Sequence, residues 1–280
     1  MSAHTTLRVG GKADLFYVTE TSGDLIKAIR LARSFGVPVT VIGEGSGVVV
    51  GDGGLEGIVV KSRSERIQIK PHRSLTDFFR KPGQKKVEVT IDGGVKEKKK
   101  KKKLEEKGIE TFDDLDEYAG SIAGMVREGL GKEYLKNMSV IDNHGGVKSI
   151  QHGKEMKDNV VIEATFLLTE EKKEKKKEKP SAAKRGHGFV VKVFEDLAKE
   201  EIEMLGYATN DPAYLIGEIL NMKGFRMGRM RVAIQNQNTI ENLGGGTAEE
   251  YVKLVEEIKN RAREAVGIEL TEKVVRLGKF

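Results

Sequence analysis

Residues 38–54 read PVTVIGEGSGVVVGDGG, and this stretch decides which folds the chain can adopt. A short apolar strand over 38–42 leads directly into the glycine-rich loop 43–47, GEGSG. Glycines let a ligand approach the backbone closely, and consecutive N–H groups in such a loop form a concave site for phosphate. The next residues, VVV at 48–50, favour a strand, so the loop lacks the helix of the usual dinucleotide fingerprint, and no Lys-Ser or Lys-Thr follows as in a P-loop. The spacing therefore leaves two interpretations open, an anion-binding loop and a glycine-rich turn between strands.

The segments on both sides of this loop alternate between strand and helix. Upstream, 14–20 predicts a strand and 22–35 predicts a helix capped by Ser22 and ended by Gly36. Downstream, 57–61 predicts a further buried strand, and this order favours a parallel pair with a right-handed crossover. The remaining expected elements are strands over 86–91, 138–142, 159–168 and 268–277, and helices over 96–107, 212–222 and 247–266, the last of them starting at Thr247 and stopping at Gly267. The class is therefore α+β or α/β.

Positive charge is concentrated in two lysine runs, KEKKKKKK at 96–103 and KKEKKKEK at 172–179, which account for a formal net charge of +6. Like charges repel, so we expect both runs to be exposed to solvent. Neither run carries the interleaved aromatic residues of a base-stacking platform, so we expect no specific nucleic acid partner. The second run indicates a lysine-rich linker over 171–180, which separates a first domain at 1–170 from a second at 181–280.

The composition excludes several kinds of site. The 280 residues include no cysteine, which excludes a disulfide framework, cysteine–zinc sites and cysteine nucleophiles. The five histidines have no metal-ligand spacing, so we expect no metal site. No apolar run approaches the roughly 20 residues of a membrane helix, and residues 1–16 lack the pattern of a signal peptide. We therefore expect a cytoplasmic protein that does not bind membranes.

Several motifs of the chain resemble those of the UDP-N-acetylenolpyruvoylglucosamine reductases, in the order of that family. The family pattern N-T-x-x-x-G-G-x-A-D is similar to residues 5–14, TTLRVGGKAD. The family's first flavin loop, G-x-G-S-N, resembles 43–47, where Gly47 replaces the asparagine, and its second, P-G-S-I-G-G-A-V, resembles AGSIAGMV at 119–126. The C-terminal likenesses are KGFRMG at 223–228, Asn238, Asn242, GGGTA at 244–248 and GIEL at 267–270. The resemblance thus covers most of the chain.

The resemblance implies an α+β fold with an FAD-binding domain of the vanillyl-alcohol-oxidase (PCMH) type and a smaller C-terminal α/β substrate domain. The FAD-binding domain would have two lobes, about 1–65 and 66–170. The implied reaction is reduction of UDP-N-acetylenolpyruvoylglucosamine to UDP-N-acetylmuramate in peptidoglycan precursor synthesis, with FAD as cofactor and NADPH as hydride donor. The implied flavin contacts are Gly43, Glu44, Gly45, Ser46, Gly47, Val48, Gly120, Ser121 and Gly124, and the implied substrate contacts are Arg226 and Asn238.

The likeness is weakest at the family's catalytic positions. In the family a serine of G-S-x-F-K-N-P donates a proton, whereas GFVVKVF at 188–194 puts Phe189 there, and phenylalanine has no transferable proton. Lys192 matches the family lysine. A gapless alignment puts Lys273 at the position of a family glutamate, while Glu272 is adjacent and would face the other side of a strand. The family's Y-R-x-S motif is missing. Glu272 and Lys192 are the catalytic residues that we expect.

Three functions fit these observations. The first is a divergent reductase of this family, acting on a UDP-sugar as a monomer. The second is an FAD-binding relative that has lost this reaction and is a pseudoenzyme or an oxidoreductase for another substrate. The third is a basic anion-binding protein without flavin, suggested only by the lysine runs. An absorbance spectrum separates the third from the others, and substrate-dependent NADPH oxidation separates the first from the second.

Overall fold

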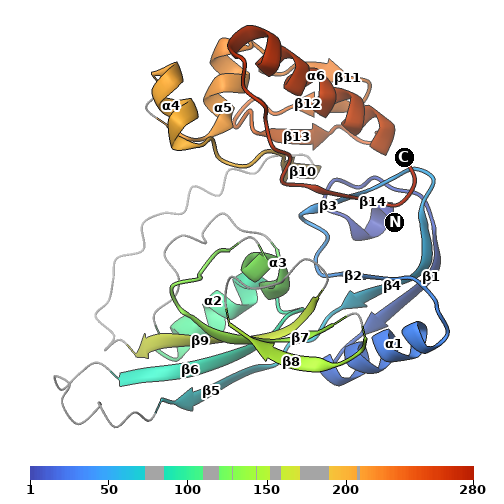
Figure 1. Cartoon of the computed structure of the whole chain (residues 1–280), viewed down its shortest axis with the longest axis vertical. Coiled ribbons are helices and arrows are strands. Elements are labelled where there is room, and N and C mark those ends of the chain that lie inside the picture. The colour runs from blue at the N-terminus through green and yellow to red at the C-terminus, as the bar shows by residue number, and fades with distance from the viewer. Residues whose placement is uncertain are drawn as a thin grey trace. The chain divides into compact units, whose positions relative to one another are not determined.

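The chain forms two compact units in a computed structural model (Figure 1). The residues described are 1–72, 85–109, 120–127, 129–142, 144–151, 159–170, 189–206 and 209–280, without the side chains of 97–99, 189 and 204. The central unit comprises 15–44 and 57–183, and the C-terminal unit comprises 1–14, 45–56 and 184–280. These units differ from the division at 1–170 and 181–280, because two N-terminal segments group with the C-terminal residues. The expected linker at 171–180 lies outside the described residues.

The first sheet confirms the strands expected around the glycine-rich loop. Its strand order is β1-β4-β2, with β2 parallel to β4 from the Val39–Ile58 pair to the Ile42–Lys61 pair. The bounds of this region are β1 Ala13–Thr19, α1 Ser22–Ser34, β2 Val39–Ile42, β3 Val48–Val50 and β4 Leu55–Ser62. Gly36 follows the helix with φ +66, as expected for its stop. The cap of α1 is Thr21 and not Ser22, because Thr21 Oγ1 accepts the Asp24 N–H at 3.1 Å while Ser22 Oγ has no partner.

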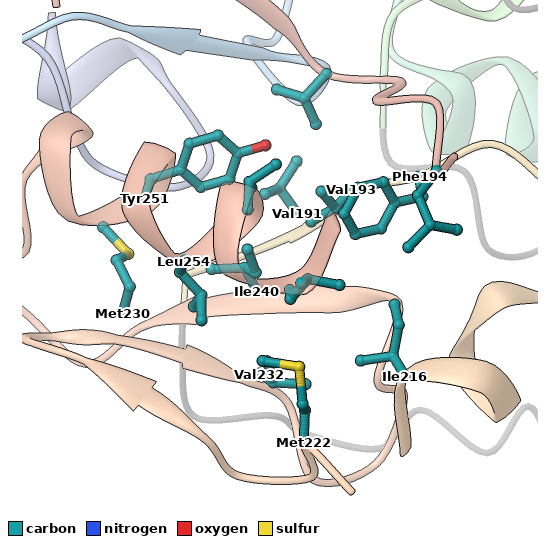
Figure 2. Packing of buried hydrophobic residues seen from close by; sticks show 14 of the residues in the cluster. Val191, Val193, Phe194, Ile216, Met222, Met230, Val232, Ile240, Tyr251 and Leu254 are labelled. Carbon is teal, nitrogen blue, oxygen red and sulfur yellow. The ribbon is translucent and has the colours of Figure 1, made fainter. Parts of the chain in front are cut away.

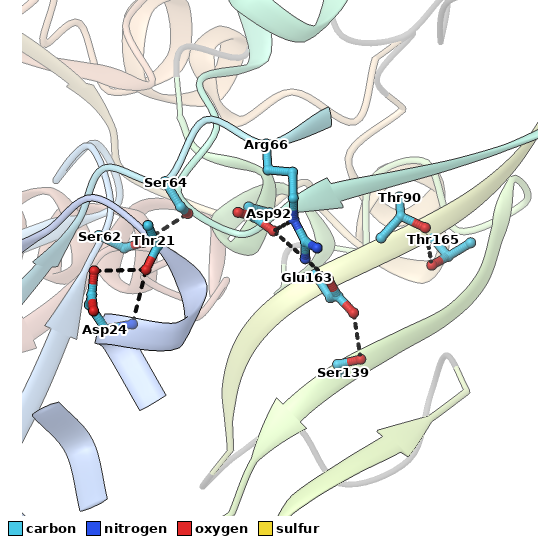
Figure 3. A network of polar contacts seen from close by, with 10 residues as sticks. All are labelled: Thr21, Asp24, Ser62, Ser64, Arg66, Thr90, Asp92, Ser139, Glu163 and Thr165. Carbon is cyan, nitrogen blue, oxygen red and sulfur yellow. Dashed lines mark hydrogen bonds and ion pairs between the residues drawn. The ribbon is translucent and has the colours of Figure 1, made fainter. Parts of the chain in front are cut away.

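The second sheet of the central unit is antiparallel, with the order β5-β6-β9-β7-β8. Its elements are β5 Ile67–Pro71, β6 Lys85–Asp92, α2 Glu97–Glu106, α3 Ile122–Arg127, β7 Leu135–Ile141, β8 Val147–Ile150 and β9 Val160–Glu170. Leu104 of α2 and Met125 of α3 are buried in one core with the strands. Arg66 ties strands together by binding Asp92 at 3.0 Å and also Glu163, which accepts a hydrogen bond from Ser139 at 3.1 Å (Figure 3).

The lysine run at 96–103 is not exposed throughout, which corrects the expectation from its charge. It forms most of α2, and Lys100 is fully buried, with its Nζ atom 3.9 Å from Met125 Sδ. A helix has one inner face, so a continuous run must place one lysine stem in the core along with Leu104. Lys102 is exposed on the same helix. The run at 172–179 lies outside the described residues.

Replacing Lys100 with alanine should therefore lower the free energy of unfolding by about 1–3 kcal/mol, because the buried stem loses its packing contacts. Lys102→Ala, on the exposed face of the same helix, should change it by less than about 0.5 kcal/mol. Urea unfolding followed by circular dichroism measures both values. Equal stabilities of the two variants would contradict the burial of Lys100.

The C-terminal unit packs one long helix against a small antiparallel sheet of order β10-β13-β12-β11 (Figure 2). Tyr251 and Leu254 of the helix meet Val191, Val232 and Ile240 of the sheet in one core. The elements are β10 Phe189–Lys192, α4 Lys199–Leu205, α5 Pro212–Tyr214 with a π-helical turn at Leu215–Ile219, β11 Arg226–Met227, β12 Met230–Val232, β13 Thr239–Asn242, α6 Ala248–Val266 and β14 Val275–Leu277.

The long helix α6 confirms the expected boundaries, whereas the last strand is shorter than expected. Thr247 caps α6 in a capping box with Glu250, and Gly267 follows with φ +73. Of the expected strand 268–277, only Val275–Leu277 forms a strand, β14, which pairs in parallel with β3. No helix among the described residues is both long enough and apolar enough to span a membrane.

Candidate functional site

In the central unit, the two glycine-rich loops touch at Gly43 and Ser121. A Cβ atom on Gly43 would lie 2.3 Å from Ser121 Oγ, so a side chain at this position would collide with the second loop. Lys96 also joins the loops. Its backbone forms a β-bridge with Ser121, and its Nζ atom lies 2.9 Å from Glu44 Oε2. The structure thus brings together three of the residues expected to contact the flavin.

The second loop is held by backbone hydrogen bonds. Gly120 and Ser121 are buried, whereas Gly124 is half-buried and its N–H donates to Ser121 Oγ at 3.4 Å. The N–H groups of Ile122 and Ala123 donate to the carbonyls of Val95 and Gly93, at 2.9 Å in both cases. These bonds fix the loop where α3 begins.

In the C-terminal unit, the rest of the first loop is fixed by the protein itself. Gly45 has φ +73, and its Cβ atom would lie 2.3 Å from the carbonyl oxygen of His4. The Gly45 carbonyl accepts the Thr6 N–H at 2.9 Å, and the Gly47 carbonyl accepts the Val275 N–H at 3.0 Å. Ser46, Gly47 and Val48 are half-buried. Gly45→Val would therefore damage the fold directly, and flavin loss in that variant would not identify a flavin contact.

A polar cavity of about 380 Å³ lies in the central unit beside Glu44 and Lys96. It opens at the carboxyl ends of the parallel strands β2 and β4, where α/β proteins commonly bind ligands. The residues that line it are Glu20, Glu44, Lys61, Arg63, Glu65, Gly94 and Lys96. The volume fits part of a dinucleotide, with Lys61, Arg63 and Lys96 as cations for phosphate and Glu20, Glu44 and Glu65 as acceptors for hydroxyl groups. The residues present therefore fit FAD.

Lys61 is the most buried charged residue lining this cavity, with 8% of its surface exposed. Burial lowers the pKa of its ammonium group, an effect that the carboxylate of Glu44 opposes and that Arg63 and Lys96 reinforce. Lys61 and Lys96 were not among the expected site residues. The sequence did carry a signal for Lys61, a single charged residue at the end of the apolar run GIVV.

The expected catalytic residues, Lys192 and Glu272, both lie in the C-terminal unit, but one is exposed and the other is mostly buried. Lys192 is exposed on β10, and its Nζ atom lies 3.3 Å from Asp196 Oδ1. Glu272 is only 10% exposed in its side chain and accepts a hydrogen bond from Tyr251 at 2.9 Å. Its Oε2 atom lies 2.7 Å from Arg276 and 3.7 Å from Lys259. Protein groups therefore occupy both carboxylate oxygens.

Lys273 lies beside the end of β10. Its N–H donates to the Val193 carbonyl at 2.8 Å, and the Glu195 N–H donates to the Thr271 carbonyl at 3.0 Å. Because side chains alternate along an extended segment, Lys273 and Glu272 face opposite sides. Burial is the main cause that raises the pKa of Tyr251 well above its usual range, and the adjacent Glu272 adds to it, so the Tyr251 hydroxyl keeps its proton.

The two expected substrate contacts also differ from each other. Arg226 is exposed on β11, where it is available to a ligand. Asn238 is fully buried, and its side chain accepts the Phe194 N–H at 2.9 Å and donates to the Phe194 carbonyl at 3.1 Å. In this structure Asn238 supports the end of β10, and its contact with substrate stays a prediction. The described residues hold no cluster of histidine, aspartate and glutamate suited to a metal ion.

Two protein-family models match the chain and show the class of protein to which it belongs. A family model described as FAD binding domain matches residues 13–151, so the chain is a flavoprotein with an FAD-dependent oxidoreductase fold. A second model, described as UDP-N-acetylenolpyruvoylglucosamine reductase, C-terminal domain, matches residues 192–277. The chain belongs to the UDP-N-acetylenolpyruvoylglucosamine reductase family, as a divergent member.

The relatives support this assignment along the whole chain. The UDP-N-acetylenolpyruvoylglucosamine reductase of Anoxybacillus flavithermus is 24% identical, with 100% of this chain and 93% of the relative covered. The reductase of the same name from Solibacter usitatus is 27% identical, with 99% and 95% covered. The crystal structure of UDP-N-acetylenolpyruvylglucosamine reductase from Thermus caldophilus has a TM-score of 0.67 and 19% identity, and covers 99% of this chain and 97% of its own. That structure confirms the expected fold.

Proposed function

We propose that the chain is an FAD-dependent reductase that uses NADPH to convert UDP-N-acetylenolpyruvoylglucosamine to UDP-N-acetylmuramate in peptidoglycan precursor synthesis. The observation that carries this proposal is the succession of the two family matches, FAD binding domain over 13–151 and reductase C-terminal domain over 192–277. The contact of Gly43 with Ser121 supports it, because it joins the two loops that the family resemblance assigns to the flavin. We further propose that the protein acts as a monomer in the cytoplasm and binds neither membranes nor specific nucleic acids.

When bound, FAD supplies the carrier that takes hydride from NADPH and gives it to the enolpyruvyl double bond. The chain's own residues bind and orient the cofactor and the substrate. The Lys96–Glu44 ion pair keeps the two glycine-rich loops together, and the exposed cations Lys192 and Arg226 offer charge-assisted hydrogen bonds to an anionic nucleotide sugar. Phe189 cannot supply the proton that completes the reduction, so this proton comes from water or another side chain. The residues that we propose to hold the flavin are Gly43, Glu44, Gly45, Ser46, Gly47, Val48, Gly120, Ser121 and Gly124.

A second candidate is an FAD-binding relative that has lost this reaction. Phe189 at the position of the family's proton donor favours it, and so does the engagement of Glu272 by Tyr251, Arg276 and Lys259. Such a protein keeps its flavin and either reduces another substrate or has no catalytic role.

The test is NADPH oxidation by the purified protein, followed at 340 nm with and without the enolpyruvyl nucleotide sugar. A flavin absorbance spectrum together with substrate-dependent NADPH oxidation and formation of UDP-N-acetylmuramate supports the reductase. A flavin spectrum without any substrate-dependent oxidation supports the second candidate and contradicts the first. Protein that takes up no FAD contradicts both.

A further inference from the structure

The polar cavity of the central unit holds a mostly buried lysine whose ammonium group has no direct partner among the described residues. Lys61 is the penultimate residue of β4 with 8% of its surface exposed, and within the described part of the chain its ammonium group makes no hydrogen bond or ion pair. The stem of Lys61 is buried while its ammonium group faces the cavity without a hydrogen-bonded partner on the protein, and partial burial of a charge in this way is unfavourable. The position therefore favours an anionic ligand that is not part of the protein.

The carboxylates around the cavity do not supply that partner. Glu44 is the acidic residue whose charge acts on Lys61, and its Oε2 atom is already 2.9 Å from Lys96 Nζ. Glu20 and Glu65 are exposed at the rim, where water screens their charges, and Arg63 is exposed there as well. Lys61 is thus the most buried cation of the cavity, and the other charged residues of the lining are three glutamates and two cations.

The wall beside Lys61 is rigid. Gly94 lines the cavity, and a Cβ atom there would lie 2.6 Å from Ser62 Oγ and 2.8 Å from Ser64 Oγ. The two buried hydroxyl groups lie 3.2 Å apart. Figure 3 draws the hydrogen bond between them as a dashed line. A wall that is packed in this way has little room to rearrange when a ligand binds, which lowers the entropic cost of binding.

We propose that Lys61 is the cationic contact for a phosphate group, and that this group belongs to the diphosphate of FAD. This assignment rests on the proposed function. The cavity shares Glu44 with the glycine-rich loop 43–47, and such loops bind phosphate through their N–H groups. A lysine next to a loop of this kind adds the positive charge that the backbone groups lack. Lys61 therefore strengthens the binding of FAD beyond what the backbone N–H groups of the loop provide.

The experiment measures FAD affinity of flavin-stripped protein by quenching of flavin fluorescence. Lys61→Met keeps the length of the apolar stem and removes the charge, so we expect the dissociation constant for FAD to rise by about 10- to 100-fold, in line with a charged hydrogen bond. Binding of riboflavin, which has no phosphate, should not change. Lys27→Met is the matched control, because Lys27 belongs to the same unit and its side chain is 83% exposed. This control should bind FAD like the wild type.

The pH dependence of FAD affinity, compared between the wild type and the charge-preserving variant Lys61→Arg, tests the same assignment while a cationic side chain is kept. FAD affinity of the wild type should fall as pH rises through the lowered pKa of Lys61, because the neutral amine no longer attracts the diphosphate. Lys61→Arg should bind FAD at neutral pH and remove this dependence, because a guanidinium stays charged. An unchanged pH profile in Lys61→Arg would overturn the assignment.

Inorganic diphosphate distinguishes the two possible sources of phosphate. If diphosphate competes with FAD in the wild type and loses its effect in Lys61→Met, the assignment to the cofactor is supported. If it binds through Lys61 without displacing FAD, the lysine serves a separate anion and the FAD assignment is overturned. Equal FAD affinity of wild type and Lys61→Met overturns the role of Lys61 alone, whereas wild-type protein that binds no FAD overturns the proposed function as well.

Discussion

Replacing Phe189 with serine should raise the rate of substrate reduction by about 10²-fold and leave the reduction of FAD by NADPH unchanged. A positioned general acid typically contributes about 10²–10⁴-fold, and Phe189 stands where the family resemblance implies such an acid. Phe189 begins β10, and its backbone pairs with Asn242 of β13. Anaerobic stopped-flow measurements separate the two half-reactions, because NADPH bleaches the flavin absorbance and the nucleotide sugar restores it.

The control for this change is Val190→Ser on the same strand. Val190 is 37% exposed, and successive side chains of a strand face opposite sides, so a serine there cannot replace a donor at 189. Lys273→Glu should increase the gain of Phe189→Ser, because it restores a carboxylate where the family resemblance implies a glutamate, at a residue whose N–H donates to the Val193 carbonyl beside the end of β10. A wild-type rate as high as that of Phe189→Ser would show that another residue donates the proton. No gain in the double variant, with flavin still bound, would favour the relative without this reaction.

Elements with local signals could be predicted from the sequence. The boundaries of α6 follow from Thr247 and Gly267, since a cap and a stop act within one turn of the helix. The strands around the glycine-rich loop could be predicted because they are short apolar runs bounded at both ends by turn-forming residues. The family motifs then supplied the identity of the loops.

Pairing between distant segments could not be predicted in this way. Asp52 accepts the N–H groups of Ala248 at 2.9 Å and Glu249 at 3.0 Å, and so neutralises the start of α6 from 196 and 197 positions away in the sequence. The short strand β3 pairs with β14 at the other end of the chain. Such contacts explain why the N-terminal segments group with the C-terminal unit, and no local pattern reveals them.

The roles of charged residues also could not be predicted, neither within a run of like charges nor at single charged positions. A run of lysines has no hydrophobic phase, so nothing in 96–103 indicated that Lys100 would be the buried member. In the sequence Lys61 is only a charged residue near the end of a strand pattern, and the cavity that it lines is formed by segments distant along the chain. At Glu272 the alternation predicted a side chain on the opposite side from Lys273, but it could not identify its partners, which come from α6 and from four residues downstream.

Glu272→Ala should destabilise the protein strongly, by about 3–5 kcal/mol. The change removes the carboxylate that Arg276 and Lys259 share and leaves the buried Tyr251 hydroxyl without an acceptor, while Arg276 keeps its second partner, Glu256, at 2.8 Å. Breaking a buried pair by removing one partner typically costs this much, because the remaining charge stays desolvated. Since about 1 kcal/mol shifts the melting temperature of a chain of this size by roughly 2–4 °C, a drop of roughly 6–20 °C is expected in differential scanning calorimetry.

Glu269→Ala is the matched control, because Glu269 pairs with Arg263 in the same C-terminal segment but its side chain is 64% exposed. Surface pairs contribute about 0–1 kcal/mol, so this variant should melt within roughly 4 °C of the wild type. Glu272→Gln, which keeps the volume and one acceptor, separates a structural role from catalysis. If Glu272 only holds α6 to the C-terminal segment, Glu272→Gln lowers the melting temperature and the turnover number stays near that of the wild type at a temperature where both are folded. A fall in turnover by 10²-fold or more at an unchanged melting temperature would contradict the structural role and would make Glu272 the anionic group that the family resemblance implies.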